Sequence, residues 1–340
     1  MKKLGLLVLT ILVVLTASFV PGCSSKSPAK NTSSTSGSKV SGAWVGKKIG
    51  IADISLYDEW CQAVAGQFTS QGKAAGFAEL NNQNGNLDAE TQQKQVENFI
   101  AKKYDMILID PVSPDGIKPT LDKAKAAGIP VICFDSSTTW SDIITHVAWD
   151  DPQTGVLSAD YIAKYAQANL GGKVKIGMLE MLAAPHTAIR GTAFKQELEK
   201  DLGKSNITYV FEQDFGNTVE KAQTIVTNNI AKPMDFIWGA VDNAAQGARL
   251  ALQTNGITKT QVVSDGAWGD QPFNEINDGD ANYTMCIGVS PISMVQLVLT
   301  SAEDYFAGKT SSIPKEQNCE LDVIDKTNIS QFVQFITKKS

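Results

Sequence analysis

Histidine is scarce in this chain of 340 residues, in which His146 and His186 stand far apart. Because structural and catalytic zinc sites use several histidines or cysteines, this scarcity disfavours a histidine-based metal site. No D-x-D-x-D loop of the calcium-binding kind is present either. We therefore expect no bound metal ion.

Several cofactor and enzyme signatures are also missing. The first strand of neither half leads into G-x-G-x-x-G, and the sequence has no Walker A loop and no G-x-S-x-G turn. These absences disfavour a nicotinamide-dependent enzyme, a P-loop ATPase and a serine hydrolase. We expect a protein that is not an enzyme and that uses no cofactor.

The sequence also has no excess of lysine and arginine over aspartate and glutamate. The net charge is −6, so no basic surface is available to neutralise phosphates, and nucleic acid is not an expected partner.

The chain is longer than a single hydrophobic core usually supports, which predicts two domains.

The N-terminus carries an export signal. A basic start, MKK, precedes the apolar run LGLLVLTILVVLTASFV, and the run ends in VPGC. VPGC resembles a bacterial lipobox, so residues 1–23 are expected to be a lipoprotein signal peptide, with Cys23 as the lipid attachment site. Pro21 is unusual in that motif, and a signal peptide cut elsewhere or a retained anchor are the alternatives. Residues 24–45 are rich in Ser, Thr, Lys and Gly at their start and are expected to be a flexible tether.

One phrase occurs twice in the remaining sequence. Residues 98–107 read NFIAKKYDMI and residues 228–237 read NNIAKPMDFI. Around each copy, apolar runs of strand length alternate with segments of helical periodicity, in the order β-α-β-α-β-α-β. This pattern predicts an α/β protein with two parallel sheets flanked by helices. The phrase itself is expected to be a helix end, a turn that contains the aspartate, and a strand start.

Candidate ligand contacts follow the predicted strands. Asp135 and Asp265 each end the fourth strand of a half, and open α/β sheets bind ligands at the carboxyl ends of their strands. Each aspartate could instead cap a turn or a helix. Arg190, at the start of a helix in the second half, is the natural cationic donor, or else a surface arginine paired to a carboxylate.

Aromatic residues gather near the same strand ends. They are Tyr57, Trp60, Trp140, Trp149, Phe215, Trp238 and Trp268. Any one of them is more often a core residue than a ligand contact. Flat rings with carboxylates and an arginine suit a sugar, because rings cover its C–H faces and charged groups bond its hydroxyls.

The order and spacing of five segments resemble the type I periplasmic binding protein family, in its ribose-binding branch. The segments are IADISLYDEWCQAVAGQF, ILIDPVSPDGIKPTLDKAKAAGIPVICFD, HVAWDDPQTGVLSADYIAKYA, AIRGTAFKQEL and VVSDG. The resemblance covers nearly all of residues 47–325. It implies two Rossmann-like lobes joined by a three-segment hinge near residues 149–150, 286–287 and 318–319. The first lobe would comprise residues 46–149 and 287–318, and the second residues 150–286 and 319–340.

The resemblance also implies a set of ligand contacts. These are Tyr57, Trp60, Cys61, Asp135, Trp149, Arg190, Phe215, Asp242 and Asp265. Three positions depart from the family pattern. Ser136 replaces a frequent arginine, Val241 replaces an asparagine before Asp242, and Cys61 replaces a second aromatic residue. A pocket identical to that of the ribose binders is therefore not expected.

The remaining cysteines allow two arrangements. By the family topology, Cys286 and Cys319 would lie near adjacent hinge strands, so a disulfide between them is possible in an exported protein. Cys61 and Cys133 would lie near the strand ends of the first lobe. The alternative is that all four are buried free thiols.

The function that the resemblance implies is capture of a monosaccharide-sized carbohydrate by a monomer that delivers it to the permease of an ABC transporter. The protein would be exported and held by lipid at the outer face of the cell membrane, or lie in the periplasm. A receptor subunit for a chemotaxis or two-component sensor is the main alternative, and a sugar-modifying enzyme is a further one.

Overall fold

The computed structural model describes residues 41–56, 59–182 and 185–335. The predicted signal peptide, Cys23, most of the predicted tether, and Tyr57 lie outside the described residues. The described chain forms two lobes, each built on one sheet.

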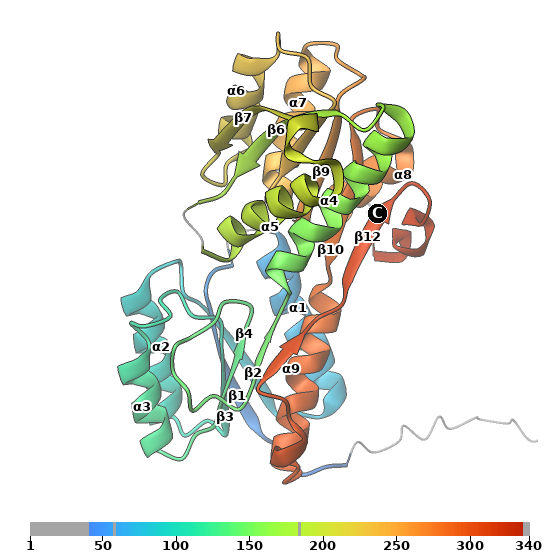
Figure 1. Cartoon of the computed structure of the whole chain (residues 1–340). Coiled ribbons are helices and arrows are strands. Elements are labelled where there is room, and N and C mark those ends of the chain that lie inside the picture. The colour runs from blue at the N-terminus through green and yellow to red at the C-terminus, as the bar shows by residue number, and fades with distance from the viewer. Residues whose placement is uncertain (1–40, 57–58, 183–184, 336–340) are drawn as a thin grey trace, which may run out of the picture. The chain divides into compact units, whose positions relative to one another are not determined.

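The first lobe contains these elements (Figure 1): β1 (Lys48–Asp53), α1 (Glu59–Ala75), β2 (Glu79–Asn84), α2 (Ala89–Ala101), β3 (Met106–Ile109), α3 (Lys118–Ala126), β4 (Val131–Phe134), β5 (His146–Ala148), α9 (Pro291–Phe306) and β11 (Glu316–Asn318). Its sheet has the order β11-β5-β4-β3-β1-β2 and every pairing is parallel.

The second lobe contains the following elements: α4 (Asp151–Asn169), β6 (Val174–Glu180), α5 (Pro185–Leu202), β7 (Ile207–Asp214), α6 (Val219–Asn229), β8 (Phe236–Gly239), α7 (Asp242–Thr254), β9 (Gln261–Ala267), α8 (Asp270–Asp278), β10 (Tyr283–Val289) and β12 (Leu321–Asp325). Its sheet has the order β12-β10-β9-β8-β6-β7. Here only β12 runs antiparallel to its neighbour, β10. The predicted class, two parallel-dominated sheets flanked by helices, is confirmed.

Buried residues alternate between the two faces of each sheet, because successive side chains of a strand point to opposite sides. In the first lobe, Ile51 and Leu108 pack with α1 and α9, whereas Ile107 and Ile109 pack with α2 and α3. Figure 1 shows α2 and α3 side by side along their face of the sheet. In the second lobe, α4 and α5 cover one face and α6, α7 and α8 the other.

The repeated phrase has the same structural role in both lobes. Each copy runs from the end of a helix, α2 or α6, through a turn into β3 or β8, as predicted. Asp105 accepts the backbone N–H of Lys48 through Oδ2 at 2.9 Å, and Asp235 accepts that of Lys175 at 2.8 Å. Each repeated aspartate therefore ties the start of the third strand to the start of the first.

The chain passes between the sheets at three places. The first passage lies between β5 and α4, and the third lies between Asn318 and Leu321. The second was expected at 286–287, but β10 stays paired with β12 as far as Val289. That passage therefore occurs at Ser290, immediately before α9 joins the first lobe.

Candidate functional site

Three carboxylates lie at the carboxyl ends of neighbouring strands in the first lobe. Asp53 ends β1, Asp110 follows β3, and Asp135 follows β4. The register pairs Ala52 with Ile109, which places Asp53 beside Asp110. Since neighbouring strands are about 4.8 Å apart, these carboxylates form one group, called here the carboxylate edge.

Burial dominates the chemistry of the carboxylate edge. Asp53 and Asp110 are only 2% and 1% exposed. Burial raises the pKa of Asp53 to about 7, against a hydrogen bond from Asn82, and the charge of Asp135 raises it further. Burial also raises the pKa of Asp110 well above its usual range, and the charges of Asp135 and Asp53 add to this effect. Close to neutral pH, therefore, this edge binds protons that ordinary aspartates have released.

Asp135 connects the carboxylate edge electrostatically to the second lobe. It is half-buried, with a φ of 53°, a left-handed conformation that few residues other than glycine adopt. Burial raises the pKa of Asp135, a charged His186 lowers it most strongly, Asp151 raises it, and Arg190 lowers it. His186, Asp151 and Arg190 all belong to the second lobe, so charges of that lobe act on the pKa of this first-lobe carboxyl.

Arg190 is the central cation of the second-lobe strand ends. It is 5% exposed and its Nε donates to Asp151 Oδ1 at 2.8 Å, with Nη2 at 2.7 Å from the same oxygen. Its Nη1 donates to the backbone oxygen of Ala240 at 3.1 Å. A Cβ at Gly266, whose φ is +65°, would lie 2.3 Å from Nη1, so glycine is required for the guanidinium to occupy this place.

Asp265, on β9, is fully buried. Its Oδ2 accepts the hydroxyl of Thr154 at 3.1 Å, while its Oδ1 is buried without a hydrogen-bond partner among the described residues. Burial raises the pKa of Asp265 to about 6, and the charge of Arg190 opposes this shift. The charge of Arg190 thus acts on Asp265, and the role of both residues as ligand contacts stays a prediction.

Two of the predicted aromatic contacts also meet. The rings of Trp60 and Trp149 lie 6.2 Å apart at an interplanar angle of 71°, an edge-to-face contact. Trp60 is partly exposed, whereas Trp149 and Cys61 are buried in the first-lobe core. Trp60 and Trp149 therefore stand next to the first passage between the lobes.

Two other predicted contacts have local partners in the second lobe. Phe215 has no exposed surface and packs in the core with α6 and α7. Asp242 is half-buried and accepts the hydroxyl of Tyr283 through Oδ1 at 2.7 Å. These contacts give both residues a structural role, and their ligand role stays a prediction.

The sequence analysis missed four residues of this site: Asp53, Asp110, Asp151 and His186. Asp53 and Asp110 carry the same signal as Asp135, an aspartate at a strand end, in IAD and ILID. Asp151 and His186 follow no strand directly. Asp151 belongs to the site through its ion pair with Arg190, and His186 through its effect on the pKa of Asp135.

The possible disulfide between Cys286 and Cys319 is wrong. All four described cysteines are buried, and none of them forms a disulfide. The register pairs Cys286 with Ile324 and Val289 with Leu321, so Cys319 lies beyond the opposite end of this strand pair. At about 3.3 Å per residue this separation far exceeds the Cα distance of a disulfide. Cys61 and Cys133 likewise form no disulfide among the described residues, which agrees with the alternative of four buried thiols.

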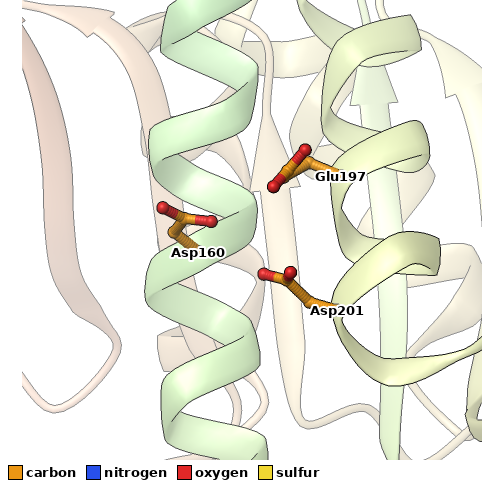
Figure 2. Close-up of side chains that lie close together, drawn as sticks. All are labelled: Asp160, Glu197 and Asp201. Carbon is orange, nitrogen blue, oxygen red and sulfur yellow. The ribbon is translucent and has the colours of Figure 1, made fainter.

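A cluster of acidic residues lies away from the carboxylate edge. Asp160 on α4 and Glu197 and Asp201 on α5 point toward one another in Figure 2, with one ligand-type oxygen of each within 4.8 Å of the others. Lys200 forms an ion pair with Glu197 at its rim. Burial and the charge of Asp160 raise the pKa of Asp201.

Among the described residues, no helix is both long and apolar enough to cross a membrane.

Two parallel-dominated sheets with charged strand ends that face each other define a two-lobe α/β protein. The chain belongs to the periplasmic binding protein family, because the family model described as periplasmic binding protein domain matches residues 49–310.

Curated relatives of this chain include sugar and polyol binders. The ribose import binding protein of Salmonella typhimurium is 30% identical over 171 residues, which cover 49% of this chain and 55% of that protein. The ribose import binding protein of Escherichia coli is 30% identical over 56% of this chain and 62% of its own length. The xylitol-binding protein of Mycolicibacterium smegmatis is 26% identical over 69% of this chain and 65% of its own length. The chain thus aligns with little more than half of the two ribose proteins.

Solved structures share the fold. The binding protein of the arabinose ABC transporter from Shewanella sp. ANA-3 has a TM-score of 0.74 at 23% identity, over 84% of this chain and 94% of that one. A solute binding protein from Actinobacillus succinogenes with bound D-allose also has a TM-score of 0.74, at 22% identity, over 84% of this chain and 100% of that one. At these identities the likeness concerns the fold alone.

Proposed function

We propose that this chain is an extracytoplasmic solute-binding protein that captures a monosaccharide-sized carbohydrate between its two lobes. The observation that carries the proposal is the match of residues 49–310 to the periplasmic binding protein model, together with relatives that are named as binders of ribose and xylitol. Polar groups that face each other across two lobes can bond the hydroxyls of one small ligand from both sides.

Hinge closure is the proposed mechanism. A ligand held by one lobe offers new contacts to the other, and this difference in binding free energy shifts the population toward the closed form. The buried carboxylates lose little further solvation when the lobes close, because the fold has already removed most of their water. No catalytic step is proposed, since members of this family bind ligands.

The proposed partner of the closed form is the permease of an ABC transporter. Export through the N-terminal signal and a lipid on Cys23 would keep the protein beside that permease. Replacement of Cys23 by serine is then expected to move the protein from the membrane fraction into the soluble exported fraction.

A sensor role is the second candidate. The same fold, with a TM-score of 0.71 at 20% identity, occurs in a fructose binding periplasmic domain of a hybrid two component system. Copurification of a permease after cross-linking would support transport, and copurification of a sensor kinase would support the second candidate.

A ligand panel tests the carbohydrate proposal directly. Thermal unfolding of the purified protein is measured with pentoses, hexoses and polyols, followed by calorimetry for each compound that raises the melting temperature. Small-angle scattering with and without the binding compound then measures closure. If no carbohydrate or polyol binds, the proposal is wrong.

A further inference from the structure

The end of the described chain packs its aromatic rings against the second lobe. Phe332 and Phe335 both lie against Trp268, with ring centroids 6.3 and 5.2 Å from the centroid of its ring. Trp268 directly follows β9 and also packs edge-to-face on Phe273 of α8. In Figure 1 this red end of the chain lies beside α8 and β12. Phe335, the last residue described, is therefore anchored to the second lobe.

A groove of about 380 Å³ lies beside these rings, and we call it the passage groove. Its lining includes Trp268, Phe332 and Phe335. It also includes Ser290, at the second passage between the lobes, and Glu320, at the third. The groove thus brings together the end of the described chain and two of the three passages.

The passage groove contains two carboxylates and no cation. Glu320 is exposed and Asp322 of β12 is half-buried, and both line the groove. Among the described residues, neither carboxylate forms an ion pair or accepts a hydrogen bond, and no lysine or arginine lines the groove. Burial raises the pKa of Asp322, and the charge of Glu320 raises it further. A cation beside these two side chains would remove this repulsion.

The sequence places two cations a few residues beyond the groove. Residues 336–340 read ITKKS, so Lys338 and Lys339 follow Phe335 by three and four positions. An extended chain spans at most about 3.5 Å per residue, so Lys338 can lie as far as about 10 Å from Phe335 before its own side chain extends. Because Phe335 lines the same groove as Glu320 and Asp322, both ammonium groups are within reach of both carboxylates.

We propose that residues 336–340 dock in the passage groove, where Lys338 and Lys339 pair with Glu320 and Asp322. An isoleucine opens the segment and would add apolar surface to the ring cluster at Phe335. The docked segment would link the end of the second lobe to two passages, and so restrain the backbone on which hinge closure depends. This inference holds whichever ligand the protein binds.

Zero-length cross-linking tests the docking directly. A carbodiimide activates a carboxylate, a lysine amine that touches it displaces the reagent as a urea, and an amide bond remains. Chymotrypsin cleaves after Phe335, so mass spectrometry finds ITKKS either free or joined to another peptide. We expect most of the joined product to contain Glu320 or Asp322, and its yield to fall as salt screens the ion pairs.

A double variant assigns the cross-links to the groove. Glu320→Gln with Asp322→Asn keeps the side-chain shapes and removes both charges, so the cross-links should disappear. The amines of Lys338 and Lys339 should then react with acetic anhydride about threefold faster, a ratio that the loss of an exposed ion pair supports. Asp278→Asn is the control, because Asp278 is an exposed carboxylate on α8 that does not line the groove. Thermal unfolding verifies that all variants are folded.

Three results would overturn the docking. The first is an ITKKS peptide that stays free or joins Asp278 as often as the groove carboxylates. The second is an acetylation rate that is the same in the parent protein and the double variant. The third is a cross-linked product that is mainly a dimer and disappears on dilution, because the groove would then hold the segment of a second copy.

Discussion

Trp60 donates its indole N–H to the backbone oxygen of Val289 at 3.0 Å, across 229 residues of sequence. Trp60 lies at the start of α1 in the first lobe, and Val289 is the last residue of β10 in the second sheet. The bond therefore fixes the second passage between the lobes to the helix that follows the first strand.

Trp60→Phe removes this donor but keeps an aromatic ring. We expect the free energy of unfolding to fall by about 1 kcal/mol, the usual net contribution of one hydrogen bond. Urea unfolding measures the loss. Trp44→Phe is a matched control, because Trp44 donates its indole N–H to the backbone oxygen of Ala75 at 2.9 Å, within the first lobe. Both variants should lose similar stability, but only Trp60→Phe should change the affinity for a sugar. If Trp60→Phe binds the sugar as tightly as the parent protein, the hydrogen bond from Trp60 to Val289 has no part in closure.

Asp53 makes stability depend on pH. Its folded pKa is about 7, raised from 3.8 by burial. The unfolded carboxyl releases its proton near pH 4 and the folded one near pH 7, so the folded state binds more protons between these values. The free energy of unfolding is therefore greatest below the unfolded pKa, near pH 4, and falls as the pH rises through the folded pKa, near pH 7. The total loss is at most about 4 kcal/mol.

Asp53→Asn imitates the protonated carboxyl at every pH. Urea unfolding at pH 5, 6, 7 and 8 should show a flatter profile for this variant and a higher stability than the parent at pH 8. Asp142→Asn is the control, because Asp142 is an exposed partner of Lys125 in the same lobe. Its stability should fall with pH as steeply as that of the parent protein. An Asp53→Asn profile as steep as that of the parent would assign the pH dependence to other groups, of which Asp265 is the first candidate.

Periodicity predicted the duplicated part of the fold well. Each β-α-β-α-β-α-β unit is present, because its central strands are short continuous apolar runs that are buried at every position, as in MILI of β3 and FIWG of β8. The end of the chain was not predictable in this way. The placement of β11 and β12 in different sheets depends on distant pairing: β11 pairs with β5, more than one hundred residues earlier, and β12 passes back to pair with β10 on the far side of α9.

The candidate site was predicted in part, for a related reason. Asp135, Arg190 and Asp265 follow from position alone, since strand ends and helix starts converge at one edge of a sheet. Whether an aromatic ring faces a ligand or the core depends on packing, and Phe215 proves to be fully buried. The carboxylate edge could be recognised only after the structure placed Asp53 and Asp110 beside Asp135.

The free cysteines give a simple chemical prediction. In the Cys23→Ser variant, Ellman's reagent should find four thiols in denaturant, with or without prior reduction, because none of Cys61, Cys133, Cys286 and Cys319 forms a disulfide in the described part of the chain. In the native protein these buried thiols should react slowly, since burial raises the pKa of Cys133 and Cys286 well above the usual range. Two thiols that rise to four only after reduction would demonstrate a disulfide.

Arg190→Met keeps most of the side-chain volume and removes the charge. Asp151 and Asp265 then lose their cation, and an uncompensated buried charge costs about 3 kcal/mol of unfolding free energy. Because the charge of Arg190 lowers the pKa of Asp265, that pKa should rise above about 6 in the variant. The lost stability should therefore return in part as the pH falls from 7.5 to 5 and Asp265 takes up a proton.

Lys195→Met is the control for Arg190→Met, because Lys195 lies on the same helix and pairs with Glu180 at 3.3 Å and Glu212 at 2.8 Å, but is partly exposed. Its loss should cost less than about 1 kcal/mol and leave ligand binding unchanged. Arg190→Met should weaken binding of a sugar by roughly 1–3 kcal/mol, since the ligand then meets an unpaired second-lobe carboxylate instead of a donor. Calorimetry on both variants measures the difference, and equal affinities would place the ligand away from Arg190 and remove the main support for a site between the lobes.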